Sequence, residues 1–299
     1  MATTQVNDTD HPPAGPPRRR IPMALVTGAF VVLILVLVVL LVVVKVTRGT
    51  TTVQPPAVTP APETVVKAVT SVPAADFDAV GAPEAGQPEE TTLAGQPPLA
   101  TGGLPTVVFV GAEFCPYCAA ERWAVVAALG RFGTFRHLGA TASSGDDVFP
   151  DTPTFTFEGT AYRSRYVAFE AVERYKDAPS TTDPPGFPPL HGLDAGEVDL
   201  LRRYDGSSGQ QAAVLPFVDV DDKLVVSGAG IGFSPALFQG LSMVQVADDL
   251  SQPSSAVAQA VLGAANRLSA AVCAATGGTP ASVCESSGVE AGARRLGLP

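Results

Sequence analysis

The chain has 299 residues, of which 46% are hydrophobic and 16% are charged, and its formal net charge is -10. Nucleic-acid binding needs a basic surface, so this acidic composition leaves no nucleic-acid partner to expect. The residues beyond the N-terminal apolar run are enough for one domain of ordinary size.

An aliphatic run near the N-terminus predicts a membrane anchor. Residues 24–44 carry no charge and match the length of about 20 residues that a membrane-spanning helix requires. A cleavable signal peptide has a shorter apolar region, of about 7 to 15 residues, and a small-residue cleavage site, and neither fits this run. We therefore expect a tail over residues 1–20 and a signal anchor over residues 21–46, in contact with the lipid bilayer.

The basic residues around this run bear on its orientation. Arg18, Arg19 and Arg20 precede it, whereas Lys45 and Arg48 follow it, so the positive-inside bias is small. A short basic tail before a large translocated domain is the commoner arrangement. We expect a single-pass protein of the cell membrane, with a cytoplasmic N-terminus and an extracytoplasmic main domain. The even number of cysteines, four, agrees with an oxidising compartment.

Two stretches, residues 51–62 and 81–103, are rich in proline and glycine and have the composition of connectors. We expect a flexible linker over residues 47–62 and an extended segment over residues 63–104. The second segment should dock on the folded domain, because it carries apolar side chains that a linker does not need. These are Val65, Val66, Val69, Val72, Phe77 and Val80.

The motif GAEFCPYC (111–118) lies between a predicted strand and a predicted helix. Residues 106–110 are β-branched and aromatic, which is typical of a buried strand. The alanine-rich residues 119–132 carry apolar side chains at helical spacing, which predicts an amphipathic helix. Cys115 and Cys118 are therefore expected at the N-terminus of a helix.

This position favours thiol chemistry, because the free N–H groups and the partial positive charge of a helix N-terminus favour a thiolate over a thiol. We expect Cys115 to be the exposed nucleophile and Cys118 the inner, resolving thiol, with Pro116 and Tyr117 as accessory residues of the first turn. The pair would then perform thiol–disulfide exchange. A permanently closed, structural disulfide is the alternative.

The strand, the CPYC motif and the helix resemble the active-site junction of the thioredoxin superfamily. That family has a second landmark, a cis-proline that opens a strand beside the cysteines. Leu215 and Pro216 in AAVLPFVDVDDKLVVSGAG (212–230) match it, and the proline, hairpin, glycine, helix order follows. The resemblance implies protein clients held along Leu215 and Pro216, no cofactor, and an unidentified membrane or extracytoplasmic redox partner.

A second resemblance covers about residues 63 to 245. The phrases GAEFCPYCAAERWAVVAALGRFGTF and TPTFTFEGTAYRSRYVAFEAVE, the two serines at 143–144 and the apolar strip before Val80 are similar to the DUF929 family. That family is often membrane-anchored and is known only as a domain of unknown function. It implies a fold and no activity.

The chain departs from thioredoxins at Phe109, where they carry a buried acid that accepts a proton from the resolving thiol. Glu113 or Glu121 could replace that acid, although a solvated surface carboxylate is the plainer interpretation of each. CPYC also occurs in glutaredoxins, but we find no basic cluster for glutathione.

The distance from Cys118 to Pro216 predicts an insertion, over about residues 139–211, within a domain over residues 105–250. Alternating residues around a turn at Glu158 and Gly159 predict β-structure there. We expect its aromatic side chains to pack in the core, and a substrate-facing aromatic surface is the alternative. Residues 194–197 resemble a capping box and predict a short helix.

A helical extension is expected over residues 251–299. Cys273 and Cys284 are expected to form a structural disulfide that pins a helical hairpin. A four-cysteine zinc site is the sharper alternative, but its ligand pairs would be more closely spaced, so we expect no metal.

The fold expected is α/β: a thioredoxin-like domain with an insertion, preceded by one transmembrane helix and followed by helices. We expect the protein to be a thiol–disulfide oxidoreductase. The alternative is a non-catalytic binding or assembly module tethered to the membrane.

Overall fold

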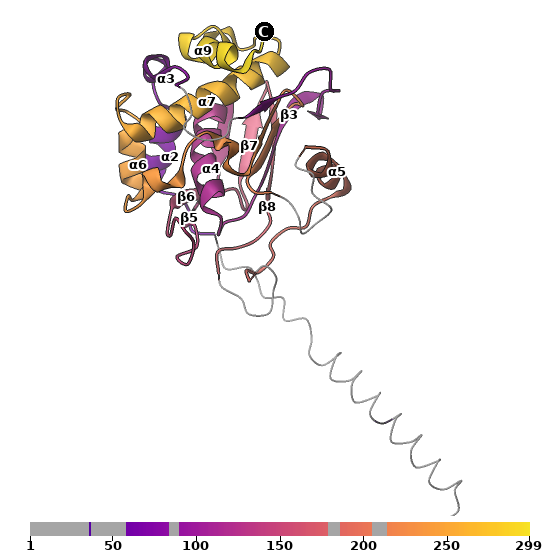
Figure 1. The fold of residues 1–299 in the computed structure, drawn as a ribbon, viewed down its shortest axis with the longest axis vertical. Helices are drawn as coiled ribbons and strands as arrows, with labels where there is room; N and C mark the ends of the chain where they lie inside the picture. Colours follow the sequence, from indigo (N-terminus) through magenta and orange to yellow (C-terminus); the bar gives the residue numbers. More distant parts are fainter. Residues whose placement is uncertain (1–35, 37–57, 84–89, 179–185, 205–213) are drawn as a thin grey trace, which may run out of the picture. The chain divides into compact units, whose positions relative to one another are not determined.

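A computed structural model of the chain describes residue 36 and residues 58–83, 90–178, 186–204 and 214–299 (Figure 1). The chain divides into two units, Met1–Pro55 and Pro56–Pro299. In the first unit only Val36 is described, and it is helical. The predicted tail, most of the predicted membrane anchor and most of the predicted linker therefore lie outside the described residues.

A mixed β-sheet forms the centre of the second unit. Its strands are β1 (Thr91–Thr92), β2 (Ala100–Thr101), β3 (Leu104–Gly111), β8 (Ala168–Glu173), β9 (Phe217–Val220) and β10 (Leu224–Ser227). Strand β3 pairs in parallel with β8 on one side and antiparallel with β9 on the other. In this register Val108 lies opposite Glu170 of β8 and Asp219 of β9. The order continues from β9 through β10 to β1, and β2 pairs with the first residues of β3.

Four further strands form two separate pairs beside this sheet. They are β4 (Gly133–Arg136), β5 (Gly139–Ala142), β6 (Pro153–Thr156) and β7 (Ala161–Ser164). Strand β5 pairs with β6, and β4 pairs with β7, both antiparallel. The β-structure predicted around the turn at Glu158 and Gly159 is confirmed by β6 and β7, but these two strands do not form a hairpin, because each pairs with a different strand.

The helices of the described residues are α2 (Glu63–Thr70), α3 (Ala74–Val80), α4 (Pro116–Leu129), α5 (Ala195–Tyr204), α6 (Met243–Asp249), α7 (Ala256–Ala275), α8 (Ala281–Cys284) and α9 (Ser287–Leu296), with short 3-10 turns η1 (Gly228–Ile231) and η2 (Pro235–Phe238). Figure 1 shows α4 and α7 on one face of the sheet and α5 on the other. The predicted short helix after Asp194 is α5, and Asp194 and Glu197 exchange the two hydrogen bonds of a capping box.

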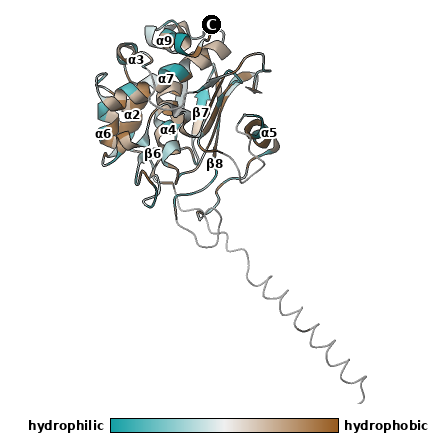
Figure 2. Ribbon diagram, in the orientation of Figure 1, coloured by the Kyte–Doolittle hydropathy of each residue, from teal (hydrophilic) through white to brown (hydrophobic). Residues whose placement is uncertain are grey.

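Alternation along the central strand explains why helices cover both faces. Successive side chains of a strand point to opposite faces of the sheet. Val107 and Phe109 belong to the core that includes α4 and α7, whereas Val108 and Val110 pack with Leu200 and other residues of α5. The central strands are accordingly brown, and so hydrophobic, in Figure 2. The result is a mixed α/β fold with helices on both faces, which confirms the coarse fold class.

Helix α4 is more deeply buried than its sequence suggests. Every side chain from Cys118 to Leu129 is buried, so the predicted amphipathic character is wrong. The reason is that α7 covers the face of α4 that would otherwise meet water, while the sheet, β6 and α2 cover the remainder. Within the described residues, α7 is long and apolar enough to span a membrane, but most of it is buried inside the protein.

The segment over residues 63–104 is not extended throughout. Residues 63–80 form α2 and α3, each preceded by a proline, Pro62 and Pro73. Val65 and Val69 are four residues apart, so they share one face of α2, and both are buried. These residues form helices because their apolar side chains recur at helical spacing, although the segments around them are rich in proline.

The predicted insertion over residues 139–211 also needs correction. Strand β8 comes from within this range, yet it is the parallel neighbour of β3 in the main sheet. The range is therefore an integral part of the domain. Farther along the chain, a disulfide joins Cys273 in α7 to Cys284 in α8, as the sequence predicts, and α9 folds back onto α7.

Candidate functional site

Cys115 and Cys118 lie where the central strand meets the buried helix. Cys115 is the N-cap residue of α4, and Pro116 occupies the first turn. The Cys115 sulfur accepts a hydrogen bond from the backbone N–H of Cys118 at 3.3 Å. Both cysteines are free thiols. Cys115 is 8% exposed and Cys118 is 0% exposed, so only Cys115 retains any contact with the surface.

The pKa values of the two thiols are shifted in opposite directions. The side-chain hydrogen bond with Cys118 lowers the pKa of Cys115 and outweighs the opposing effect of burial, with smaller help from backbone N–H groups and from the charge of Arg122. Burial raises the pKa of Cys118 well above its ordinary value, and the hydrogen bond and charge of Cys115 add to this rise. The arrangement therefore favours a thiolate at Cys115 and a thiol at Cys118.

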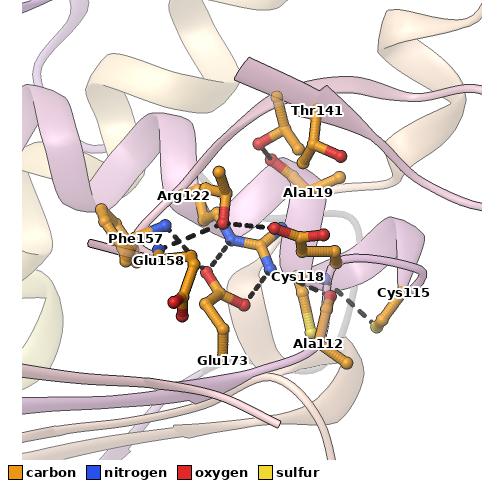
Figure 3. A network of polar contacts seen from close by, with 12 residues as sticks. Ala112, Cys115, Cys118, Ala119, Arg122, Thr141, Phe157, Glu158 and Glu173 are labelled. Carbon is orange, nitrogen blue, oxygen red and sulfur yellow. Dashed lines mark hydrogen bonds and ion pairs between the residues drawn. The ribbon is translucent and has the colours of Figure 1, made fainter. Parts of the chain in front are cut away.

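A buried ion pair lies directly behind the cysteines (Figure 3). Arg122 is fully buried on α4, four residues after Cys118, and it binds Glu173 at the end of β8 in a bidentate manner, with Nε–Oε1 and Nη2–Oε2 distances of 2.9 and 2.6 Å. Its Nη2 also donates to the Ala112 carbonyl at 2.9 Å. Glu173 accepts a further hydrogen bond from the Phe157 backbone N–H. The ion pair thus ties α4, β8 and the loop that carries the cysteines together.

The predicted client-binding residues lie beside Cys115. The Leu215–Pro216 peptide bond is cis, and β9 begins at the next residue. The Cys115 thiol donates to the Leu215 carbonyl, with a sulfur–oxygen distance of 3.9 Å. The structure therefore brings Cys115, Cys118, Leu215 and Pro216 to one place.

Aromatic side chains flank the motif on two sides. Tyr117 meets Phe149 edge to face, with ring centroids 5.9 Å apart, and Phe114 stacks on Phe187 at 4.1 Å. Val148 beside Phe149 is 70% exposed, and Val214 beside Leu215 is 46% exposed. Apolar surface is thus available next to the less buried thiol.

Glu113 is buried, so its interpretation as a solvated surface carboxylate is wrong. Thr156 donates to Glu113 Oε1 at 2.7 Å, and the Lys176 ammonium lies 3.4 Å from Oε2. The Asp177 backbone N–H also donates to Oε2. These partners fix the loop between β3 and α4, which makes Glu113 a positioning group for the motif.

Glu121 is buried as well, but in a different cluster. It interacts electrostatically with Glu90 and with Arg267 of α7, and the latter two form an ion pair at 2.7 Å. Burial, followed by the negative charge of Glu90, raises the pKa of Glu121 to about 8. The structure does not bring Glu121 together with the cysteines, because its charged neighbours come from α7 and from the segment before β1.

Sequence analysis missed Arg122 and Glu173. A signal was present for Arg122, because residues four apart share one face of a helix, which places Arg122 one turn beyond Cys118. Glu173 had no comparable signal, since its partnership depends on the pairing of β8 with β3.

The fold and site define a mixed α/β protein with a pair of free thiols at a strand-to-helix junction. Residues 93–180 match the family model described as "Domain of unknown function (DUF929)". The matched residues contain the motif, Arg122 and Glu173. No curated protein and no solved structure matches the chain.

Proposed function

We propose that this protein is a membrane-anchored, extracytoplasmic thiol–disulfide oxidoreductase that acts on protein disulfides through Cys115 and Cys118. One observation carries the proposal: two free thiols of opposite acidity meet at a helix N-terminus, beside a backbone carbonyl that a client strand could approach. The lower pKa of Cys115 suits a nucleophile, and the burial of Cys118 suits a thiol that reacts only within the protein.

The strand order supports a thioredoxin-like fold for this domain. Strand β3 leads into the motif and α4, β9 follows Pro216 beside Cys115, β10 completes a hairpin, and Gly228 leads to further helical turns. This order is the one that the resemblance to thioredoxins implies. The match at residues 93–180 supports the DUF929 resemblance but covers only the first part of this arrangement.

In the proposed reaction, the Cys115 thiolate attacks one sulfur of a client disulfide. A Cys115–client disulfide forms, and the second client sulfur leaves as a thiolate. Cys118, as a thiolate, then attacks the Cys115 sulfur, so that a Cys115–Cys118 disulfide forms and the first client sulfur leaves. The client gains two electrons and the protein loses two. The unidentified redox partner would restore the dithiol, and the reverse sequence would oxidise a client.

The client would lie along Leu215 and Pro216 in an extended conformation, where main-chain hydrogen bonds add a strand beside the sulfurs. Tyr117, Val148 and Val214 would contact its side chains. The proposed anchor, residues 21–46, would keep this exchange at the membrane, with residues 1–20 in the cytoplasm.

Substitution of the resolving thiol tests this proposal. We expect the Cys118→Ala variant to accumulate client proteins bound covalently to Cys115, because the mixed disulfide can no longer be resolved. The measurement is the recovery of adducts that dissociate on reduction. The Cys115→Ala/Cys118→Ala variant is the matched control and should recover none. Equal recovery from both variants, or no adducts where a known oxidoreductase yields them, contradicts the proposal.

A second candidate function is a membrane-tethered binding module in which the CPYC pair forms a closed, structural disulfide. The observation in its favour is the low exposure of Cys115, only 8%. The reduction potential of the pair separates the two functions. A reversible value between about -270 and -120 mV supports catalysis, whereas a value below about -300 mV marks a structural disulfide.

A further inference from the structure

The buried Cys118 presents a chemical problem for the proposed exchange. Its thiol must ionise before it can attack the Cys115 sulfur, because the thiolate is the nucleophile. Burial opposes this ionisation by raising the pKa of Cys118. Thioredoxins carry an acid at the position of Phe109, but here that position holds a fully buried phenylalanine. Another group must therefore offset the charge of the buried thiolate.

Arg122 is the cation best placed to do so. It follows Cys118 by four residues on α4, so both side chains lie on one face of the helix. Its guanidinium carbon lies 5.5 Å from the centre of the Phe109 ring, so it reaches the position of the missing acid. Ala112 connects the two groups, because its carbonyl accepts from Arg122 and its backbone hydrogen bond lowers the pKa of Cys118.

The hydrogen bonds of Arg122 are also incomplete. Nε and Nη2 are used by Glu173 and Ala112, but Nη1 is buried and has no hydrogen-bond partner within the described residues. A buried donor without a partner costs stability. Buried donors without a partner are uncommon in native proteins, and a role in redox chemistry is one explanation for them.

The charges around Cys118 come from few groups. Cys115 and Arg122 lie on the same helix as Cys118. Glu173 on β8 and Glu113 in the loop between β3 and α4 act on Arg122. Strand β6 and residues 214–217 contribute no charged side chain to this face. Burial alone would lower the pKa of Arg122, but the charge and hydrogen bonds of Glu173 raise it, so the guanidinium stays protonated.

We propose that Arg122 is a positioning residue for the exchange reaction, held by Glu173, and that it stabilises the Cys118 thiolate during resolution of the mixed disulfide. This inference rests on the proposed function. When Cys115 attacks the client, the leaving client thiolate accepts the proton of Cys118. The Cys118 thiolate, stabilised by the guanidinium, then forms the bond to the Cys115 sulfur. Arg122 donates no proton at any step, and no buried base is needed.

The test measures the pH midpoint of Cys118 thiolate formation from the ultraviolet absorbance of the thiolate, in the full chain with Cys115→Ala. We expect Arg122→Met to raise this midpoint by about one pH unit or more, because it removes the positive charge that lowers the pKa of Cys118. Arg122→Lys should restore most of the difference. Glu173→Gln should lower the midpoint, because it leaves the positive charge of Arg122 uncompensated.

The opposite signs separate this role from a merely structural one. If the ion pair only holds the fold, Arg122→Met and Glu173→Gln should perturb the midpoint in the same direction, which would overturn the inference. The double variant Arg122→Met/Glu173→Gln leaves no unpaired buried charge, so it keeps the test valid if Arg122→Met alone does not fold. Its midpoint should be higher than that of Glu173→Gln alone.

Client trapping distinguishes a failure of this inference from a failure of the proposed function. With both cysteines present, Arg122→Met should accumulate mixed disulfides on Cys115 that the wild type resolves. If the wild type exchanges disulfides but Arg122→Met changes neither the midpoint nor the amount of adducts, the inference about Arg122 is overturned and the proposed function stands. Absence of exchange in the wild type, even with the expected midpoints, overturns the proposed function and with it the role of Arg122 in resolution.

Discussion

Two identical side chains acquire different chemistry here from their positions on one helix. Cys115 is the N-cap residue and accepts the Cys118 N–H, whereas Cys118 lies one turn inside, where no solvent reaches it. Hydrogen bonding favours the charged form of the first sulfur, and desolvation disfavours the charged form of the second. The division into an attacking and a resolving thiol therefore follows from the direction of the helix.

A third titratable residue on the same helix leads to a prediction about stability. The pKa of Glu121 rises from 4.5 to about 8, chiefly through burial, so the folded protein binds this proton more tightly than the unfolded chain does. Stability should therefore fall as pH rises from about 4.5 to about 8, by up to about 1.4 kcal/mol per pH unit from this group. Glu121→Gln should remove this contribution and make the protein more stable than the wild type above about pH 8.

The free energy of unfolding, measured in denaturant across this pH range, checks the prediction. Glu290→Gln is a matched control, because it removes a carboxyl group of α9 that is 55% exposed, and its pH dependence should follow the wild type. A Glu121→Gln variant with the same slope as the wild type would show that Glu121 is ionised in the folded protein.

At the scale of elements, local patterns predicted the strand before the motif, the helix after it, the helix that begins near Asp194 and the Cys273–Cys284 disulfide. Each of these depends on residues close together in the chain. The pairing of β8 with β3 could not be predicted in the same way, because the two strands are about sixty residues apart and alternating residues fit other strand pairings equally well. The position of β8 is determined by its pairing with β3 in the folded domain and not by its local sequence pattern.

The same reasoning applies to the site. The sequence alone could predict Cys115, Cys118, Leu215 and Pro216, because each belongs to a recognisable motif. It could not predict that Glu113 and Glu121 are buried, because their burial depends on the coverage of α4 by α7 and on the loop around Lys176. For the same reason, the Arg122–Glu173 ion pair emerged only once β8 lay beside β3.

At the scale of the whole molecule, the proposed chemistry depends on the compartment. The disulfide between Cys273 and Cys284 is of a kind that persists in an oxidising environment, and the charge-free run over residues 24–44 is long enough to anchor a domain there. In a reducing cytosol that disulfide would be exposed to reduction, and a Cys115–Cys118 pair would meet few client disulfides. The orientation of the chain therefore decides which substrates are available.

Fusion of a reporter enzyme after Pro299 tests this orientation. We expect a reporter that works only outside the cytoplasm to be active, because the domain would follow a short cytoplasmic tail and one membrane span. Deletion of residues 21–46 should abolish its activity by leaving the fusion in the cytoplasm. In the intact chain, Cys273 and Cys284 should resist alkylation until a reductant is added. Activity confined to a reporter that requires the cytoplasm would contradict the extracytoplasmic assignment and would leave the dithiol without its proposed clients.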